Sequence, residues 1–121
     1  MTVGALPGQL RLEPPFPFVG RSSELAALRS LLPRADGEGR RVALLGGEPG
    51  GGKSRLVREL AHEAWADGAL VLYGDCDSVV GSPYQPVVEA LEQLVRATPP
   101  DELRADVGRV GGELVRLVPD L

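Results

Sequence analysis

One short stretch of the chain has the residue types and the spacing of a phosphate-binding loop. Residues 47–54 read Gly-Glu-Pro-Gly-Gly-Gly-Lys-Ser, which fits the pattern G-x-x-x-x-G-K-[ST]. Glycine lets backbone N–H groups come close enough to surround the crowded negative charges of nucleotide phosphates. Lys53 would supply a full charge to the β- and γ-phosphates, and Ser54 would offer its hydroxyl to Mg²⁺. The stretch therefore predicts a site for ATP or ADP with Mg²⁺.

Lysine is rare in this sequence, which makes its place in the pattern informative. Lys53 is the one lysine among 13 Lys and Arg residues. A chain that otherwise uses arginine keeps lysine where a compact ammonium is wanted. The alternative is a Gly-rich turn between a strand and a helix that binds nothing; the motif and its flanks together favour the phosphate site.

The flanks of the loop predict a strand before it and a helix after it. Residues 42–45 form a short apolar run that ends at glycine, as in a buried parallel strand. Apolar residues then recur from Leu56 to Trp65 at helical spacing. The candidate nucleotide-binding residues in this unit are Gly47, Glu48, Pro49, Gly50, Gly51, Gly52, Lys53, Ser54 and Arg55, with Ser54 also the metal ligand.

The rest of the chain predicts further helices and one more strand. Ser22 or Ser23 would cap a helix that Pro33 stops, before a polar turn over residues 35–39. Gly68 would end the helix after the loop, and residues 69–73 would form the second strand. A capping box over residues 82–85 would open a helix that buries Val87, Val88, Leu91, Leu94 and Val95 and breaks at residues 98–100. A weaker, glycine-diluted helix would follow over residues 101–117.

These elements predict an α/β P-loop NTPase fold with an incomplete parallel sheet flanked by helices. Composition narrows the possible functions. The 121 residues suffice for one small domain, and a net charge of −4 lacks the excess of basic residues that is typical of nucleic-acid-binding proteins. One cysteine fits a reducing compartment, and no apolar run is long enough to cross a membrane. We expect a cytoplasmic protein that contacts neither membrane nor nucleic acid through this segment, with residues 1–15 as an extended leader or linker.

Two other places in the sequence could do chemistry. Val19 and Arg21, in Phe-Val-Gly-Arg, could border an adenine ring, although the local sequence favours an ordinary turn. Asp75 and Asp77 follow the second predicted strand and could hold a metal as an acidic Walker B strand does. Gly74 interrupts that apolar run, so loop capping is the better interpretation.

The remaining candidates have structural interpretations. Glu48 could order a water but fits a solvated loop residue, and His62 lies on the polar face of its helix. Cys76 has no metal-ligand partner in the sequence and fits a semi-buried thiol. Tyr84 and Trp65 fit packing aromatics.

Four motifs in order resemble the AAA-type ATPase module of STAND regulators. They are Phe-Val-Gly-Arg-x-x-Glu-Leu-x-x-Leu, Gly-Glu-Pro-Gly-Gly-Gly-Lys-Ser-Arg-Leu, Gly-Asp-Cys-Asp, and Ser-Pro-Tyr-Gln-Pro-Val-Val-Glu-Ala-Leu. Similar modules occur in large LuxR-type transcriptional activators and origin-recognition-like AAA ATPases. The resemblance covers residues 16–121. It implies that the loop binds phosphates and Mg²⁺, that Val19 and Arg21 border the adenine, and that the module is an ATP-operated switch for a protein partner or effector domain.

The resemblance also implies what this segment lacks. The chain stops before the strand that would carry the family's catalytic acidic pair, so residues 16–121 resemble the front part of the module, truncated before Walker B. No catalytic residue is assigned, and whether the chain hydrolyses ATP is left open. The alternatives are a small P-loop phosphotransferase that uses Asp75, and a truncated fragment that binds nothing.

Overall fold

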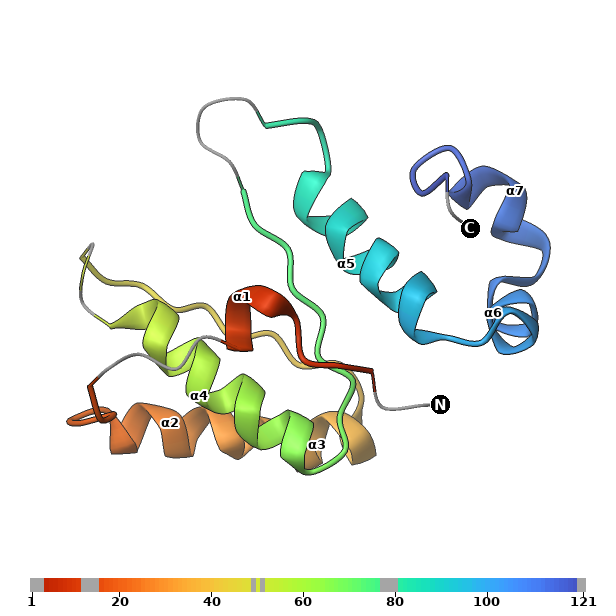
Figure 1. Cartoon of the computed structure of the whole chain (residues 1–121). Coiled ribbons are helices and arrows are strands. Elements are labelled where there is room, and N and C mark those ends of the chain that lie inside the picture. The colour runs from red at the N-terminus through yellow and green to blue at the C-terminus, as the bar shows by residue number, and fades with distance from the viewer. Residues whose placement is uncertain (1–3, 12–15, 49, 51, 77–80, 120–121) are drawn as a thin grey trace. The chain divides into compact units, whose positions relative to one another are not determined.

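The computed structural model describes residues 4–11, 16–48, 50, 52–76 and 81–119. The chain divides into two units, each with its own internal packing. One is the P-loop unit, Leu12–Ala69, and the other is the two-segment unit, made of Met1–Arg11 and Leu70–Leu121. Figure 1 shows the elements of each unit along the chain.

The P-loop unit is organised around the contact between two helices. These are α2, Ser22–Arg29, and α4, Lys53–Ala66. Their shared core is Leu25, Leu28 and Leu56, and the last of these is only 1% exposed. Burying a leucine of this kind contributes about 2 kcal/mol. This core fixes the start of α4, the helix that the phosphate-binding pattern opens.

The prediction for the first helix was wrong at both ends. Ser22 is the first residue of α2, and the Ser23 hydroxyl donates to the Glu24 carboxylate, so neither serine caps the helix. Pro33 does not stop the helix, because the chain turns at Ser30 and a second helix, α3, runs over Leu31–Glu38. Proline is tolerated there because an N–H in the first helical turn has no helical acceptor to lose. The predicted polar turn over residues 35–39 is therefore mostly helix.

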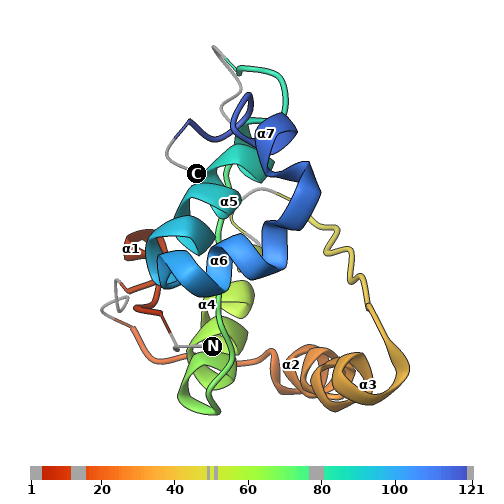
Figure 2. The ribbon, with the colours of Figure 1, turned by 90° about the vertical axis from the view of Figure 1, so that its right-hand side faces the viewer.

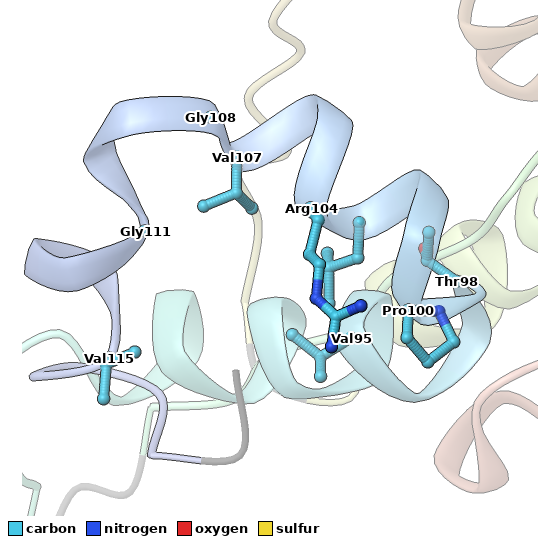
Figure 3. Close-up of a pocket in the computed structure, with 9 residues that line it drawn as sticks. Val95, Thr98, Pro100, Arg104, Val107, Gly108, Gly111 and Val115 are labelled. Atoms are coloured by element: carbon cyan, nitrogen blue, oxygen red, sulfur yellow. The ribbon is translucent and has the colours of Figure 1, made fainter.

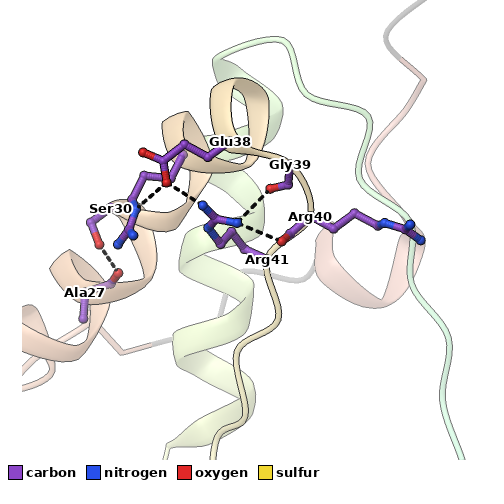
Figure 4. Close-up of polar contacts among 7 residues, drawn as sticks. Ala27, Ser30, Glu38, Gly39, Arg40 and Arg41 are labelled. Atoms are coloured by element: carbon purple, nitrogen blue, oxygen red, sulfur yellow. Dashed lines mark hydrogen bonds and ion pairs between the residues drawn. The ribbon is translucent and has the colours of Figure 1, made fainter.

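Side chains fasten the turn from α3 towards the phosphate loop. The Glu38 carboxylate accepts hydrogen bonds from two arginines, Arg34 and Arg41. Arg41 Nη1 also donates to the carbonyls of Gly39 and Arg40, at 3.3 and 3.1 Å (Figure 4). Ser30 Oγ donates to the Ala27 carbonyl one helix earlier (Figure 4). These contacts set the direction in which the chain leaves α3.

The predicted α/β fold with a parallel sheet is wrong. None of the described residues lies in a strand, and the described elements are all helical. Residues 42–45 run as open, non-helical chain (Figure 1), with Val42 84% exposed and Leu44 93% exposed. Residues 69–73 are likewise non-helical and belong largely to the other unit. An apolar run becomes a strand only when a neighbouring strand takes its backbone hydrogen bonds.

The prediction for the end of the loop helix is confirmed. Gly68 follows α4 with a φ of 93°, the left-handed conformation that glycine adopts without strain. The Gly68 N–H donates to the Trp65 carbonyl and the Ala69 N–H to the Ala64 carbonyl, at 3.0 and 2.9 Å. This pair of bonds is a Schellman cap, which satisfies carbonyls that the helix leaves open.

The described residues of the two-segment unit form five helical pieces. They are α1 Gly8–Arg11, α5 Gln85–Ala97, α6 Pro100–Val107, the 3₁₀ helix η1 Gly108–Val110 and α7 Gly111–Leu114. Figure 2 shows α6 and α7 as short pieces that follow α5. Buried apolar side chains come from both segments, namely Leu6, Leu10 and Val118. Part of the predicted leader is thus helical and packed, while its boundary at residue 16 stays a prediction.

Helix α5 departs from its prediction at the start and agrees with it at the end. Tyr84 is the N-cap residue, in a left-handed conformation with a φ of 63°, and no side chain caps the helix, so the predicted Ser82 cap is wrong. The predicted burial is also wrong, because no residue of α5 is fully buried and Val87 is 51% exposed. The break at residues 98–100 is confirmed, with Thr98 extended.

The predicted helix over residues 101–117 is split into pieces. Its glycines fall where α6 passes into η1 and where α7 begins, and Gly108 has a φ of 52°. Between α5 and these pieces lies a cavity of about 540 Å³ (Figure 3). It is lined by Val95, Thr98, Pro100, Leu103, Arg104, Val107, Gly108, Gly111 and Val115. Gly108 and Gly111 are among the residues at the edge of this cavity.

Candidate functional site

The phosphate loop curls around the side chain of Lys53. Lys53 is the first residue of α4, and its Nζ donates to the Gly47 carbonyl at 2.6 Å and to the Glu48 carbonyl at 3.0 Å. A Cβ placed on Gly47 would lie 3.5 Å from Lys53 Cδ, so Gly47 lies beside the lysine side chain. The start and the end of the motif, six residues apart, are thus held together by its one cation.

Two glycines in the motif adopt backbone conformations that side chains disfavour. Gly50 has a φ of 80° and Gly52 a φ of 85°. A residue with a Cβ would be strained in this region, which explains glycine at these two places in the pattern. Pro49 and Gly51, also predicted to bind the nucleotide, lie outside the described residues.

The N-terminus of α4 keeps its first donors available. No side chain caps the helix at Gly52, and the first helical bond runs from the Leu56 N–H to the Gly52 carbonyl at 3.0 Å. The N–H groups of residues 53–55 therefore have no acceptor within the helix. Ser54 is exposed in this first turn. Such a helix start, with its partial positive charge and a lysine beside it, suits a phosphate group.

The structure brings Arg21 to the same place. A Cβ built on Gly52 would lie 3.9 Å from Arg21 Nε, so the guanidinium reaches the point where the loop enters α4. Arg21 also forms an ion pair with Glu24 at 3.9 Å. The Ser23 hydroxyl lowers the pKa of Glu24, which keeps this carboxylate charged. Val19, the other predicted adenine contact, is 78% exposed.

Arg55 has contacts that the sequence did not predict. Its side chain is 23% exposed, with Nη1 donating to the Phe16 carbonyl at 2.8 Å and Nε to the Glu59 carboxylate at 2.7 Å. Its Cζ lies 5.8 Å from the centre of the Phe18 ring. The Arg55–Glu59 spacing of four residues was a visible signal for the ion pair. Nothing in the local sequence indicated the contact with residue 16.

The carboxylates proposed for Walker B lie in the other unit or outside the described residues. The Asp75 N–H donates to the Glu89 carboxylate at 3.0 Å, which ties residue 75 to α5. That bond, and a second one from Gln85, lower the pKa of Glu89. Asp77 lies outside the described residues. Among the described side chains, no cluster of three or more His, Cys, Asp or Glu residues could hold a metal ion by itself.

Three side chains differ from their predicted surroundings. Cys76 is exposed rather than semi-buried. Tyr84 is 72% exposed and Trp65 is 40% exposed, so neither is a core aromatic. Tyr84 also has a left-handed backbone conformation, with a φ of 63°.

A family model described as an AAA ATPase domain matches residues 17–120. The chain belongs to this AAA ATPase family. Membership indicates nucleotide binding in general, and the family generally binds ATP with Mg²⁺. The match includes the loop, the α4 start and the Arg21 segment described above. Searches of curated proteins and of solved structures gave no match.

The residues at the loop of this AAA ATPase domain fit Mg²⁺ bound together with a nucleotide. Mg²⁺ keeps several waters and takes few protein ligands beside substrate phosphates, so the exposed hydroxyl of Ser54 is enough as the ligand from the protein.

Of the helices in the described part of the chain, none is both long and apolar enough to span a bilayer.

Proposed function

We propose that the chain binds ATP or ADP with Mg²⁺ at residues 47–54. The proposal rests on one observation: Lys53 Nζ is bonded to two backbone carbonyls of the loop, at a helix start that no side chain caps. Lys53 would leave its two loop carbonyls for phosphate oxygens, and the N–H groups of the first turn would donate to the same phosphates. Ser54 would contribute its hydroxyl to the cation. Arg21 and Val19 would border the adenine.

We further propose that this binding operates a STAND-type switch in a cytoplasmic signalling or transcriptional regulator. The support is the order of the motifs: the Val-Gly-Arg box, the loop, Gly-Asp-Cys-Asp and then Ser-Pro-Tyr-Gln. Residues 16–121 would form the N-terminal part of the switch module. The partner would be a protein or an effector domain, not nucleic acid and not a membrane.

Hydrolysis by this chain should be slow. Phosphoryl transfer to water requires a carboxylate that places Mg²⁺ and a group that orients the water, besides the phosphate cradle. Among the described residues, the Asp75 N–H donates to the Glu89 carboxylate, and Lys53 in the loop is bonded to two backbone carbonyls rather than to a carboxylate. We expect about one turnover per hour or less, far below the ~1–10³ s⁻¹ of ordinary enzymes.

A thermal-melt titration followed by phosphate release tests the proposal. Mg²⁺-ATP should raise the melting temperature of the chain, because a ligand that binds the folded state stabilises it. No shift at millimolar nucleotide would mean a fragment that does not bind. Rapid phosphate transfer to a small-molecule acceptor or to water, abolished in Asp75→Asn, would establish the phosphotransferase alternative instead.

A further inference from the structure

We infer that Arg55 is a positioning residue, which fastens residues 16–21 to α4 and thereby holds Arg21 beside the phosphate loop. The inference rests on the proposed nucleotide function. In this inference, Arg55 acts by holding residues 16–21 in place and does not contact the nucleotide itself.

The Arg55 guanidinium makes two kinds of contact with residues 16–21, a hydrogen bond and a contact with an aromatic ring. Nη1 donates to the Phe16 backbone carbonyl at 2.8 Å, and the guanidinium carbon lies 5.8 Å from the Phe18 ring centre. Nε is held by Glu59 at 2.7 Å, which orients the guanidinium plane. Arginine can make these contacts together because its donors are separate and rigidly placed, whereas a lysine has one nitrogen.

The fastened segment leads directly to the loop. Phe18 packs against the core of Leu25, Leu28 and Leu56. Three residues later, Arg21 Nε lies near the Gly52 backbone at the start of α4. Residue 55 and residue 52 are within the same helical turn, so both ends of the segment are attached at the start of α4. Loss of the Arg55 contacts would release one end and let Arg21 move from the loop.

Arg29 provides a matched control on the other helix of the same pair. Its guanidinium pairs with the Glu63 carboxylate and so also links α2 to α4. Glu63 lies ten residues after Lys53, in the second half of α4, and both hydrogen bonds of the Arg29 guanidinium in the described structure go to this carboxylate. Arg29→Ala removes an interhelical arginine pair without releasing the segment.

The first test compares two ligands by calorimetry, Mg²⁺-ATP and Mg²⁺-triphosphate. Arg55→Ala should weaken the binding of ATP by about tenfold and that of triphosphate by less than about twofold. The reason is that Arg21 is proposed to border the adenine, and triphosphate has no adenine. Arg55→Lys should recover only part of the loss, and Arg29→Ala should bind both ligands as the wild type does. Equal losses for ATP and triphosphate, or none, with normal wild-type binding, would overturn the inference and leave the proposed function intact.

The second test needs no nucleotide. Phe16 and Phe18 are the only phenylalanines, so a chain labelled with 4-fluorophenylalanine gives two fluorine resonances. Arg55→Ala should move the Phe18 resonance towards that of an exposed ring, and Arg29→Ala should not. An unmoved Phe18 resonance would overturn the fastening. If the wild type bound no nucleotide, the proposed function would be wrong, and so would the role of Arg55 in nucleotide binding. The fluorine experiment would still test whether Arg55 holds residues 16–21 against α4.

Discussion

The two segments predicted as strands have contrasting surroundings. Residues 42–45, before the phosphate loop, expose Val42 and Leu44 almost fully. The other predicted strand, residues 69–73, and the residues up to 76 that follow it are attached to α5 by side chains. Gln93 accepts from the Tyr73 N–H at 2.9 Å and donates to the Tyr73 carbonyl, and Glu89 accepts from the Asp75 N–H.

The difference shows what an apolar run does and does not determine. Residues 73 and 75 lie on one edge of the segment, and residues 89 and 93 lie one helical turn apart on α5. The amide and the carboxylate therefore take the hydrogen bonds that a neighbouring strand would otherwise take. In the segment before the loop, the side chains of Val42 and Leu44 stay exposed.

The largest effect should come from Gly74→Ala. An added Cβ would lie 2.0 Å from the Pro86 carbonyl oxygen, so residues 70–76 would have to leave the start of α5. We expect a loss of about 3 kcal/mol in the free energy of unfolding, at the upper end of overpacking costs. Urea denaturation measures it. Gly46→Ala in the other segment is the control, since its Cβ would meet nothing within 4 Å, and an equal loss there would remove the contrast.

Gln93→Ala should have the next largest effect. It leaves the Tyr73 N–H and carbonyl, both partly buried, without their partner, at a cost of about 1–2 kcal/mol. Glu92→Ala beside it removes only an exposed pair with Arg96 and should cost less than about 0.5 kcal/mol. Equal urea midpoints for the two variants would show that Gln93 does not hold the segment.

Acid should weaken the same attachment through Glu89. Its pKa is lowered in the folded chain, so its contribution is present above the unfolded pKa and is lost as pH falls through the lower folded value. Glu89→Gln should therefore destabilise the chain at pH 7 more than at pH 3. Urea unfolding of both proteins at the two pH values measures this, and a difference that grows in acid would contradict it.

The smallest effect is expected in the segment before the loop. Val42→Thr and Leu44→Thr change side chains that are 84% and 93% exposed, so each should alter the free energy of unfolding by less than about 0.5 kcal/mol. A loss above about 2 kcal/mol in either variant would mean that these residues are buried in solution, as the sheet prediction required.

Local signals in the sequence predicted helices better than they predicted the sheet. The end of α4 at Gly68 and the break at residues 98–100 follow from backbone chemistry that each residue carries with it. Ser22, Ser23 and Ser82 fit a capping pattern but do not cap, because α2 begins at Ser22 itself and Tyr84 is the N-cap residue of α5. Strand pairing depends on a distant partner, which an apolar run alone does not supply.

The site was predictable where its residues are adjacent in sequence. The motif predicted the loop and the lysine, and the structure places Lys53 inside the loop that precedes it. The approach of Arg21 to Gly52 and the contact of Arg55 with Phe16 span 31 and 39 residues, and they depend on how α2 packs on α4. Spacing within a motif carries no information about such contacts.

The most direct test of nucleotide binding at this loop is a calorimetric titration of Mg²⁺-ATP into the wild type, Lys53→Ala and Arg40→Ala. Arg40 is the exposed control, because its loss removes the same charge without touching the loop. We predict that Lys53→Ala weakens binding more than tenfold, since a charge-assisted contact to phosphate is worth about 2–3 kcal/mol, and that Arg40→Ala changes it less than about twofold. Equal dissociation constants for the wild type and Lys53→Ala would contradict the account.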